Sequence, residues 1–460
     1  MIPDIIGDAL AGVSEYTEIR AHQNTNTSVV ITAGNLTSNA TAVTSGVSAR
    51  VFKDGLWGFS SAGELNREAA DTVLRAALSN ARFLSGKVTK PDVHLAETAP
   101  ARYQSPRDFV VTDQKRMLEY ARGLDDYIKE KYPNLSARSV MLVTDAMEKL
   151  LKTSAGTVSH MINPRACLYV DLSAECADGT NVELFEVMDC GCGYFGDYFT
   201  DPTQFAEKLD KLYEQLMQKR DGVFSEAGVC DCVIDPSIAG MIAHEAVGHT
   251  VEADLVLGGS VAGPNLGKQV ASPLVSIVDF AHTAFGKRAP LPVYVDDEGV
   301  ECRDTVLIEN GVLKGFMNNR ESAAHFGMEP TGHARAYGFA DEPLIRMRNT
   351  AILPGTDKLS DMIASIDNGY YLTRSMNGQA DTTGEFMFGI TMGYEIKNGK
   401  LGKALRDTTI SGVAFDMLRT VDMLSDEVSW SSSGYCGKKQ PMAVSDGGPA
   451  VKCRVNIGGR

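Results

Sequence analysis

The sequence predicts an α+β fold of two domains, built largely from antiparallel β-sheet with a few helices. Two observations lead to this prediction. Strand-like and helical segments follow one another without regular alternation, which argues against a parallel α/β sheet. In addition, 460 residues exceed what one compact core accommodates, so two domains of about 200 residues are expected.

The first half of the chain reads as strands, then helices, then strands. Residues 15–63 alternate polar and apolar side chains between Asn/Gly-rich turns and are expected to form strands. Apolar spacing predicts helices over 64–84 and 112–131, with a further run of strands across 136–190. A third helix is expected over 202–219. This order indicates an antiparallel α+β domain.

We place the domain boundary at the polar turn Arg220-Asp221-Gly222, which gives an N-terminal domain of 1–222 and a C-terminal domain of 223–460. The C-terminal domain is expected to be mainly β and to carry the catalytic residues. Asn310-Gly311 and Asn398-Gly399 are typical of tight hairpin turns.

Composition restricts the class of protein. Hydrophobic and charged contents of 43% and 22% are those of a globular protein. A formal net charge of −15 argues against nucleic acid or an anionic membrane as partner. The first residues lack the basic start of a signal peptide, and no apolar run is long enough to span a membrane. Nine cysteines, an odd number, then favour a reducing cytoplasm over a disulfide framework.

The segment most suggestive of chemistry begins the C-terminal domain. Asp235 is suited to cap a helix and Pro236 to occupy its first position, so a helix should start there. His244, Glu245 and His249 follow in an HE-x-x-x-H pattern. Two imidazoles and a carboxylate supply two metal ligands and a base for a metal-activated water. The alternative is a buried helix end with two core histidines.

The spacing of the two histidines requires a departure from α geometry. Residues five apart lie roughly 140° apart around a regular α-helix and cannot share one ion. A π-type turn, with its i→i+5 hydrogen bonds, would return both imidazoles to one face. Gly248, directly before His249, is where we expect the backbone to leave α geometry.

A catalytic zinc normally has three protein ligands, so a third is needed. Cys436 is our best candidate, because it lies beside glycines in a polar loop, where a thiolate is available to a metal. Glu252 is an alternative carboxylate ligand, and Asp254 could hold an imidazole N–H. Cys190, Cys192, Cys230 and Cys232 could form a four-thiolate site on paper, but one-residue spacing favours small core residues.

One further cluster could contact a substrate. His333, Arg335 and Tyr337 place imidazole, guanidinium and phenol within five residues, and such groups could stabilise a developing oxyanion. The alternative for each is an ordinary loop or core residue.

Taken together, these segments resemble the TldD/PmbA family of metallopeptidases, and in particular its catalytically competent TldD-like side. The resemblance rests on six segments: 244–249, 296–299, 306–315, 346–355, 377–381 and 434–437. It implies one Zn²⁺ per chain bound by His244, His249 and Cys436, with Glu245 as the catalytic base. It also implies an extended peptide laid beside a strand of the C-terminal domain. The expected partner is a second copy or a related noncatalytic chain, giving a homodimer or heterodimer.

The predicted function is that of a zinc-dependent metallopeptidase that hydrolyses small or unfolded peptides, with a zinc-activated water as nucleophile and Glu245 as general base. Two alternatives stay open. One is a noncatalytic assembly subunit whose zinc is structural or absent. The other is a zinc amidohydrolase that acts on a non-peptide amide.

Overall fold

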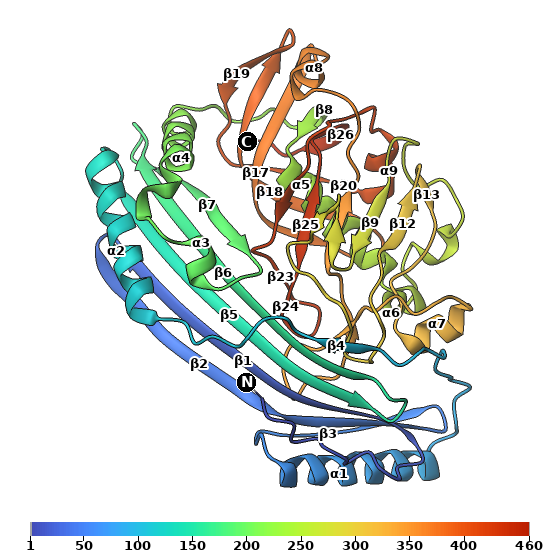
Figure 1. Ribbon diagram of the computed structural model, residues 1–460. Coiled ribbons are helices and arrows are strands. Elements are labelled where there is room, and N and C mark those ends of the chain that lie inside the picture. Colours follow the sequence, from blue (N-terminus) through green and yellow to red (C-terminus); the bar gives the residue numbers. More distant parts are fainter. Residues whose placement is uncertain (1, 460) are drawn as a thin grey trace.

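A long antiparallel sheet formed by the N-terminal part of the chain curves around the sheets formed by the remainder (Figure 1). The computed structural model describes residues 2–459. Within these residues the first sheet has the order β3-β2-β1-β5-β6-β4, with β7 also paired to β6 and β4 parallel to β6. Its strands are β1 (Tyr16–Thr32), β2 (Asn35–Lys53), β3 (Leu56–Ala62), β4 (Arg102–Gln104), β5 (Ala137–Thr153), β6 (Val158–Glu175) and β7 (Asn181–Gly191).

The helices expected in this half are present. α1 (Arg67–Lys87) packs on β2 and β3, and α2 (Gln114–Lys131) packs on β1 and β5. The short α3 (Phe195–Tyr198) and a 3-10 turn precede α4 (Ala206–Arg220), which packs on β6 and β7. Within residues 2–459, no helix combines the length and apolar composition needed to cross a membrane.

Two larger sheets make up most of the second half. One has the order β13-β12-β9-β16-β25-β22, and the other β17-β8-β26-β20-β18-β19 with β21 beside β26. Pairing is antiparallel except for β16–β25 and β17–β8. The strands are β8 (Gly228–Ile234), β9 (Ile277–Phe280), β12 (Thr305–Glu309), β13 (Val312–Leu313), β16 (Asn349–Ile352), β17 (Asn368–Ala380), β18 (Glu385–Lys397), β19 (Lys400–Ala404), β20 (Thr408–Val413), β21 (Met423–Leu424), β22 (Ser429–Ser431), β25 (Ser445–Gly448) and β26 (Val451–Ile457).

Short hairpins and helices complete the second half. The hairpins pair β10 (Thr283–Ala284) with β11 (Lys287–Arg288), β14 (Ala334–Arg335) with β15 (Leu344–Ile345), and β23 (Tyr435–Cys436) with β24 (Met442–Ala443). The helices α7 (Arg320–Phe326), α8 (Leu359–Ala364) and α9 (Ala414–Arg419) lie between strands. Asn310-Gly311 and Asn398-Gly399 adopt positive φ angles and join β12 to β13 and β18 to β19, which confirms both predicted hairpins.

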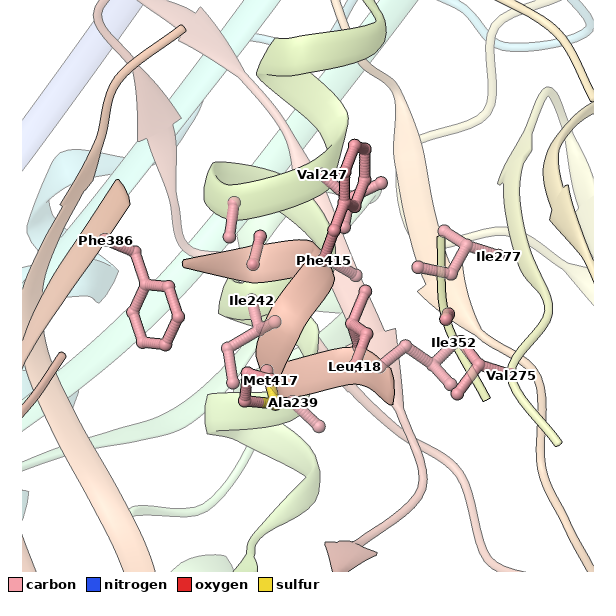
Figure 2. Packing of buried hydrophobic residues seen from close by; sticks show 14 of the residues in the cluster. Ala239, Ile242, Val247, Val275, Ile277, Ile352, Phe386, Phe415, Met417 and Leu418 are labelled. Carbon is pink, nitrogen blue, oxygen red and sulfur yellow. The ribbon is translucent and has the colours of Figure 1, made fainter. Parts of the chain in front are cut away.

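A buried helical segment passes between these two sheets. It starts as α5 (Pro236–Met241), capped by the Asp235 side chain, and continues as a π-helix over Ile242–Gly248. A 3-10 turn (His249–Val251) and α6 (Ala253–Leu257) follow. Its apolar face packs against α9 and nearby strands, where the labelled residues include Ala239, Ile242, Val247, Ile277, Ile352, Phe386, Phe415 and Leu418 (Figure 2). The predicted π-type turn is confirmed.

Gly248 has a different role from the one expected. The chain leaves α geometry at Ile242, and Gly248 itself has right-handed helical angles, with φ −53° and ψ −50°. A Cβ atom at this position would collide with the sulfur of Met347. Glycine is therefore required for close packing and not for backbone freedom.

The α+β fold with mainly antiparallel sheets is confirmed. All strands of the first sheet lie before residue 192, and those of the two larger second-half sheets begin at Gly228. The division into domains at residue 222 stays a prediction.

Candidate metal centre

Three predicted ligands lie together at the end of the buried helical segment. His244 and His249 come from the π-helix and its end, and Cys436 comes from β23. Their ligand atoms all lie within 4.8 Å of one another, and Cys436 Sγ is 3.2 Å from His249 Nε2. The backbone N–H of His249 donates to the carbonyl of His244, so an i→i+5 bond joins the two histidines.

The donor set fits a zinc ion. Two imidazoles and a thiolate are ligands that zinc prefers, and their atoms lie about 3.5 Å apart in a tetrahedral site. Both ring nitrogens of His244 are buried and have no hydrogen-bond partner within the described structure. A buried polar atom without a partner is costly, and a metal ion would satisfy it.

The electrostatics favour the thiolate. Burial raises the pKa of the Cys436 thiol, but the adjacent imidazoles of His244 and His249 outweigh burial and lower the pKa to about 4. Burial lowers the pKa of His249, whereas its contacts with Cys436 and Glu252 raise it to about 10. The cysteine is thus held in the form that binds metals.

Glu245 lies beside the ligands but outside their cluster. Its Oε2 is 3.6 Å from His249 Nε2, and its side chain is 26% accessible. The carboxylate also lines a cavity of about 840 Å³ together with His244 and Cys436. It can therefore exchange protons with a molecule in the cavity.

The cavity lies between the first sheet and the second half of the chain. Its walls include residues of β7, α4, β17 and β22, with Trp430 on β22 and Glu186 on β7. Arg374 of β17 forms an ion pair with Glu186 and donates to the side chain of Gln215 on α4. Asp446 of β25 lines the cavity as well, and burial raises its pKa to about 6. No sequence pattern pointed to these residues as a site, because they come from segments that are far apart in the chain.

The chain from Cys436 to Gln440, here called the cysteine loop, is held in place by a buried arginine. The guanidinium of Arg346 is fully buried and donates to the backbone carbonyls of Cys436, Lys438 and Gln440. Three carbonyls on one guanidinium fix the path of the loop from the ligand to Gln440. Arg346 fell within a segment of family resemblance, but no role was predicted for it.

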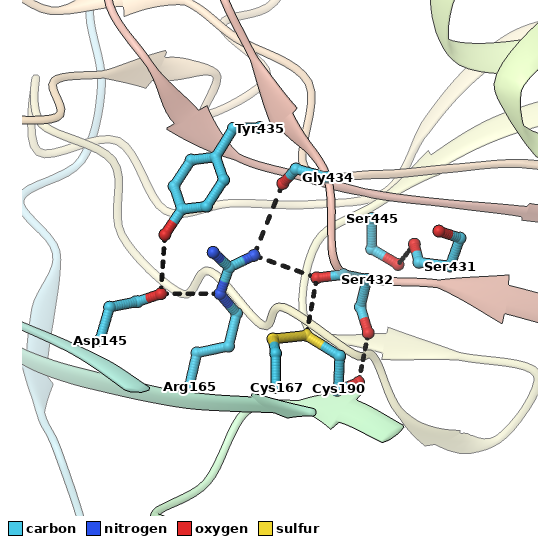
Figure 3. Close-up of a disulfide and its surroundings, with 9 residues drawn as sticks. All are labelled: Asp145, Arg165, Cys167, Cys190, Ser431, Ser432, Gly434, Tyr435 and Ser445. Carbon is cyan, nitrogen blue, oxygen red and sulfur yellow. Dashed lines mark hydrogen bonds and ion pairs between the residues drawn. A yellow bond between two sulfur atoms is a disulfide. The ribbon is translucent and has the colours of Figure 1, made fainter. Parts of the chain in front are cut away.

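A disulfide braces the chain just before the cysteine ligand (Figure 3). Cys167 and Cys190 are directly opposed on β6 and β7 and are joined, so Cys190 is half of a disulfide and not simply the small core residue that was favoured. The Ser432 hydroxyl donates to the Cys190 carbonyl, and Arg165 donates to the carbonyls of Ser432 and Gly434. These contacts anchor the segment that leads to Cys436.

The four-thiolate alternative is not formed. Cys190 is in the disulfide, Cys232 lies in the core and Cys230 is half-buried beside it. Among residues 2–459, His244, His249 and Cys436 are the one group of three or more potential ligands that comes together.

The predicted substrate contacts of His333 and Arg335 need correction. His333 is fully buried, with Nε2 2.9 Å from Asp279 Oδ1 and Nδ1 2.8 Å from Thr331 Oγ1. Arg335 is also buried and donates to backbone carbonyls of Met347 and Ala443. Both side chains are engaged in structural contacts in the interior, Arg335 on β14 and His333 directly before that strand. Neither is among the residues that line the cavity.

Tyr337 lies one layer behind the cavity wall. Its ring packs edge-on against Tyr435, with centroids 6.4 Å apart, and Tyr435 lines the cavity. Tyr337 therefore supports the wall, and direct contact with a substrate stays a prediction.

Comparison with known proteins identifies the family. A family model described as the PmbA/TldA metallopeptidase C-terminal domain matches residues 227–459, and a model of domain 1 of these metallopeptidases matches residues 17–81. The chain belongs to the TldD/PmbA family. Its metal centre and cavity lie within the part that the C-terminal model covers, apart from the cavity wall contributed by β7 and α4.

Curated relatives of this TldD/PmbA chain carry metalloprotease names. A protein of Methanothermobacter thermautotrophicus called "Metalloprotease" is 31% identical over 99% of both chains. A "Zinc metalloprotease TldD homolog" of Saccharolobus solfataricus is 36% identical over 60% of this chain and 61% of its own length. These names support a metal-dependent hydrolase.

Solved structures share the fold. The TM-score is 0.78 for a Thermotoga maritima protein of 21% identity, with 98% of this chain and 99% of the other covered. It is 0.77 for TldE from Thermococcus kodakarensis, at 18% identity with 96% and 97% covered. At these identities the likeness concerns the fold alone.

Proposed function

We propose that this chain is a zinc-dependent metallopeptidase on the TldD-like, catalytically competent side of its family. The observation that carries the proposal is that His244, His249 and Cys436 come together beside a cavity that Glu245 also lines. The metalloprotease names of the relatives support it.

In this proposal three side chains bind the metal and a fourth transfers protons. His244, His249 and Cys436 would hold one zinc ion, which when bound acidifies a water and polarises a carbonyl. Glu245 takes a proton from the attacking water and passes it to the leaving nitrogen as the C–N bond breaks. The carbonyl carbon gains the water oxygen, so the products are a carboxylate and an amine. Because Glu245 binds no metal in this scheme, its role is proton transfer alone.

The size and edges of the cavity define the substrate class. A volume of about 840 Å³ is that of a small-ligand site and admits a short stretch of extended chain. The edge strand β22 contributes Ser429, Trp430 and Ser431 to the wall. A peptide can add to such an edge through main-chain hydrogen bonds, with little demand on side-chain identity. Small or unfolded peptides therefore fit, and folded proteins do not.

We further propose that the active form is a dimer, with a second copy or with a related noncatalytic chain. β2 continues beyond its partner β3, which pairs only with residues 47–53. The free stretch 35–46 is largely exposed and contains no charged residue or proline. Long edge strands of this kind are normally covered or charged, so a partner chain is expected to cover it. We also propose a cytoplasmic location on the cysteine content alone, because the count of nine is odd and the seven cysteines other than Cys167 and Cys190 are free.

Metal content and peptide cleavage together test the proposal. Purified protein is analysed for zinc and assayed with a quenched extended peptide. A chain with one zinc and chelator-sensitive cleavage supports the peptidase. Bound zinc without cleavage, alone or with a partner chain, would favour the noncatalytic assembly subunit. Hydrolysis of simple amides in place of peptides would favour the amidohydrolase.

A further inference from the structure

We propose that Glu252 and Lys438 are positioning residues that join the two halves of the metal centre, the histidine segment and the cysteine loop. The inference rests on the proposed function, because it concerns the same site. It assigns a role to two side chains that lie behind the ligands.

Glu252 fixes the orientation of one ligand. Its Oε2 lies 2.7 Å from His249 Nδ1, while His249 Nε2 faces Cys436 Sγ at 3.2 Å. A carboxylate that accepts the N–H of one ring nitrogen sets the tautomer and directs the other nitrogen to the metal. Glu252 can do this because the chain turns to extended geometry there, with φ −69° and ψ 121°, after the 3-10 turn.

This geometry argues against Glu252 as a ligand itself. Its side chain is fully buried, and Oε2 contacts both the imidazole and, at 3.2 Å, the Nζ of Lys438. The carboxylate is not part of the three-ligand cluster. The structure also reverses the expectation for Asp254, which pairs with Lys438 and not with an imidazole.

Lys438 connects the cysteine loop to this carboxylate. It lies two residues after Cys436, and its ammonium is 3.2 Å from Glu252 and 2.9 Å from Asp254. Its side chain is 12% accessible and that of Glu252 is 0% accessible, so this ion pair is shielded from solvent, whereas Asp254 is 39% accessible. Separating Lys438 from Glu252 would leave a buried charge without its partner, so the pair favours one arrangement of the loop and the imidazole.

The connection matters because the ligands are distant in the sequence. Cys436 and His249 are 187 residues apart, so only tertiary contacts set the distance between Sγ and Nε2. Arg346 fixes the loop backbone, but it does not touch the histidines in the described structure. Lys438 and Glu252 provide the direct route from loop to imidazole.

The test measures zinc affinity without any peptide. Lys438→Met keeps chain length and removes the charge, and Glu252→Gln keeps an acceptor and removes the charge. Each should weaken zinc binding by a factor on the order of 10 to 100, the usual effect of losing a residue that orients a ligand. The double variant should lose little more than either single one, because both act through one connection. Zinc is titrated against a chromophoric chelator.

Matched variants separate positioning from general stability. Lys439→Met removes the same charge from the neighbouring exposed residue and should leave affinity unchanged. Lys438→Arg should recover most of the lost affinity. With Co²⁺ as a probe at saturation, the visible spectrum of Lys438→Met should differ from that of the wild type, while the metal-free proteins unfold at similar temperatures.

Two results would overturn the inference. One is wild-type zinc affinity and an unchanged cobalt spectrum in Lys438→Met or, should that variant not fold, in Lys438→Gln. The other is loss of all zinc in Glu252→Gln with no effect of Lys438→Met, which would make Glu252 a ligand. A wild type that binds zinc tightly but cleaves no peptide would count against the proposed function and leave this inference intact.

Discussion

Gly248 lies so close to Met347, in the connection between β15 and β16, that the π-helix and this connection pack without room for a methyl group between them. This contact occurs one residue before His249. The packing of the π-helix and the position of a metal ligand are therefore set by the same pair of residues.

Gly248→Ala should destabilise the protein by about 1–3 kcal/mol, the usual cost of overpacking a core. Met347→Ala creates the missing space, so the double variant should be less destabilised than the sum of the single changes by about 1 kcal/mol or more. Denaturant unfolding of the wild type, the two single variants and the double variant measures this coupling free energy. Strict additivity would show that the contact is not the reason for glycine.

Glu245→Gln should retain about one zinc per chain, because the carboxylate is not a ligand. Turnover should fall by a factor on the order of 10² to 10⁴, the usual contribution of a positioned acid–base group. Chelation and readdition of zinc should restore the wild type but not the variant. A Gln variant that cleaves peptides at nearly the wild-type rate would remove Glu245 from the mechanism.

Cys436→Ala should lose both stoichiometric zinc and peptide cleavage, since only two imidazoles remain. The matched control is Cys453→Ala, which removes a buried thiol of β26 outside the ligand cluster and should keep its zinc. Metal analysis after dialysis measures the difference. Full zinc in Cys436→Ala, together with its loss in Glu252→Ala, would assign the third ligand to Glu252.

The lowered pKa of buried His333 predicts how the free energy of unfolding depends on pH. Burial and the nearby charge of Arg348 lower its folded-state pKa to about 4, below an unfolded value of about 6.5. The unfolded chain therefore takes up the proton first, and stability present above pH 6.5 is lost as the pH falls toward 4. The loss attributable to this residue is about 3 kcal/mol. Denaturant unfolding between pH 7 and 4 should show a flatter profile for His333→Gln than for the wild type.

The proposed dimer can be tested at the free edge of β2. The wild type should sediment as a dimer at micromolar concentration, and Ala42→Lys should weaken it by placing a charge on the exposed edge. Lys129→Ala on the exposed face of α2 is a control that should leave assembly unchanged. An active monomer in the ultracentrifuge would show that no partner is needed.

Sequence patterns correctly predicted those structural features whose physical cause lies within a few neighbouring residues. The five-residue spacing of His244 and His249 required the π-type turn, and apolar periodicity located α1, α2 and α4. Cys436 could be singled out because its glycine neighbours are unusual for a core cysteine. In each case the physical constraint acts over a few residues.

What the sequence could not reveal depends on contacts between distant segments. Glu252 pairs with Lys438, and Arg346 donates to the loop carbonyls. Nothing in the sequence indicates that these residues lie close together in space. The predicted substrate contacts of His333 and Arg335 were wrong for a related reason. These residues have the right chemistry for a site, but the imidazole of His333 is buried against Asp279 and the guanidinium of Arg335 against backbone carbonyls.

The position of β26 has a consequence for biosynthesis. This strand lies between β8, which leads into the helical segment bearing both histidines, and β20. The ribosome makes β8 and the histidines long before it makes Cys436 and β26. A partly synthesised chain therefore carries an incomplete ligand set beside a strand that pairs with β17 on one edge only. The proposed peptidase site can therefore assemble only after synthesis has passed Cys436, and β8 gains its second neighbour only with β26.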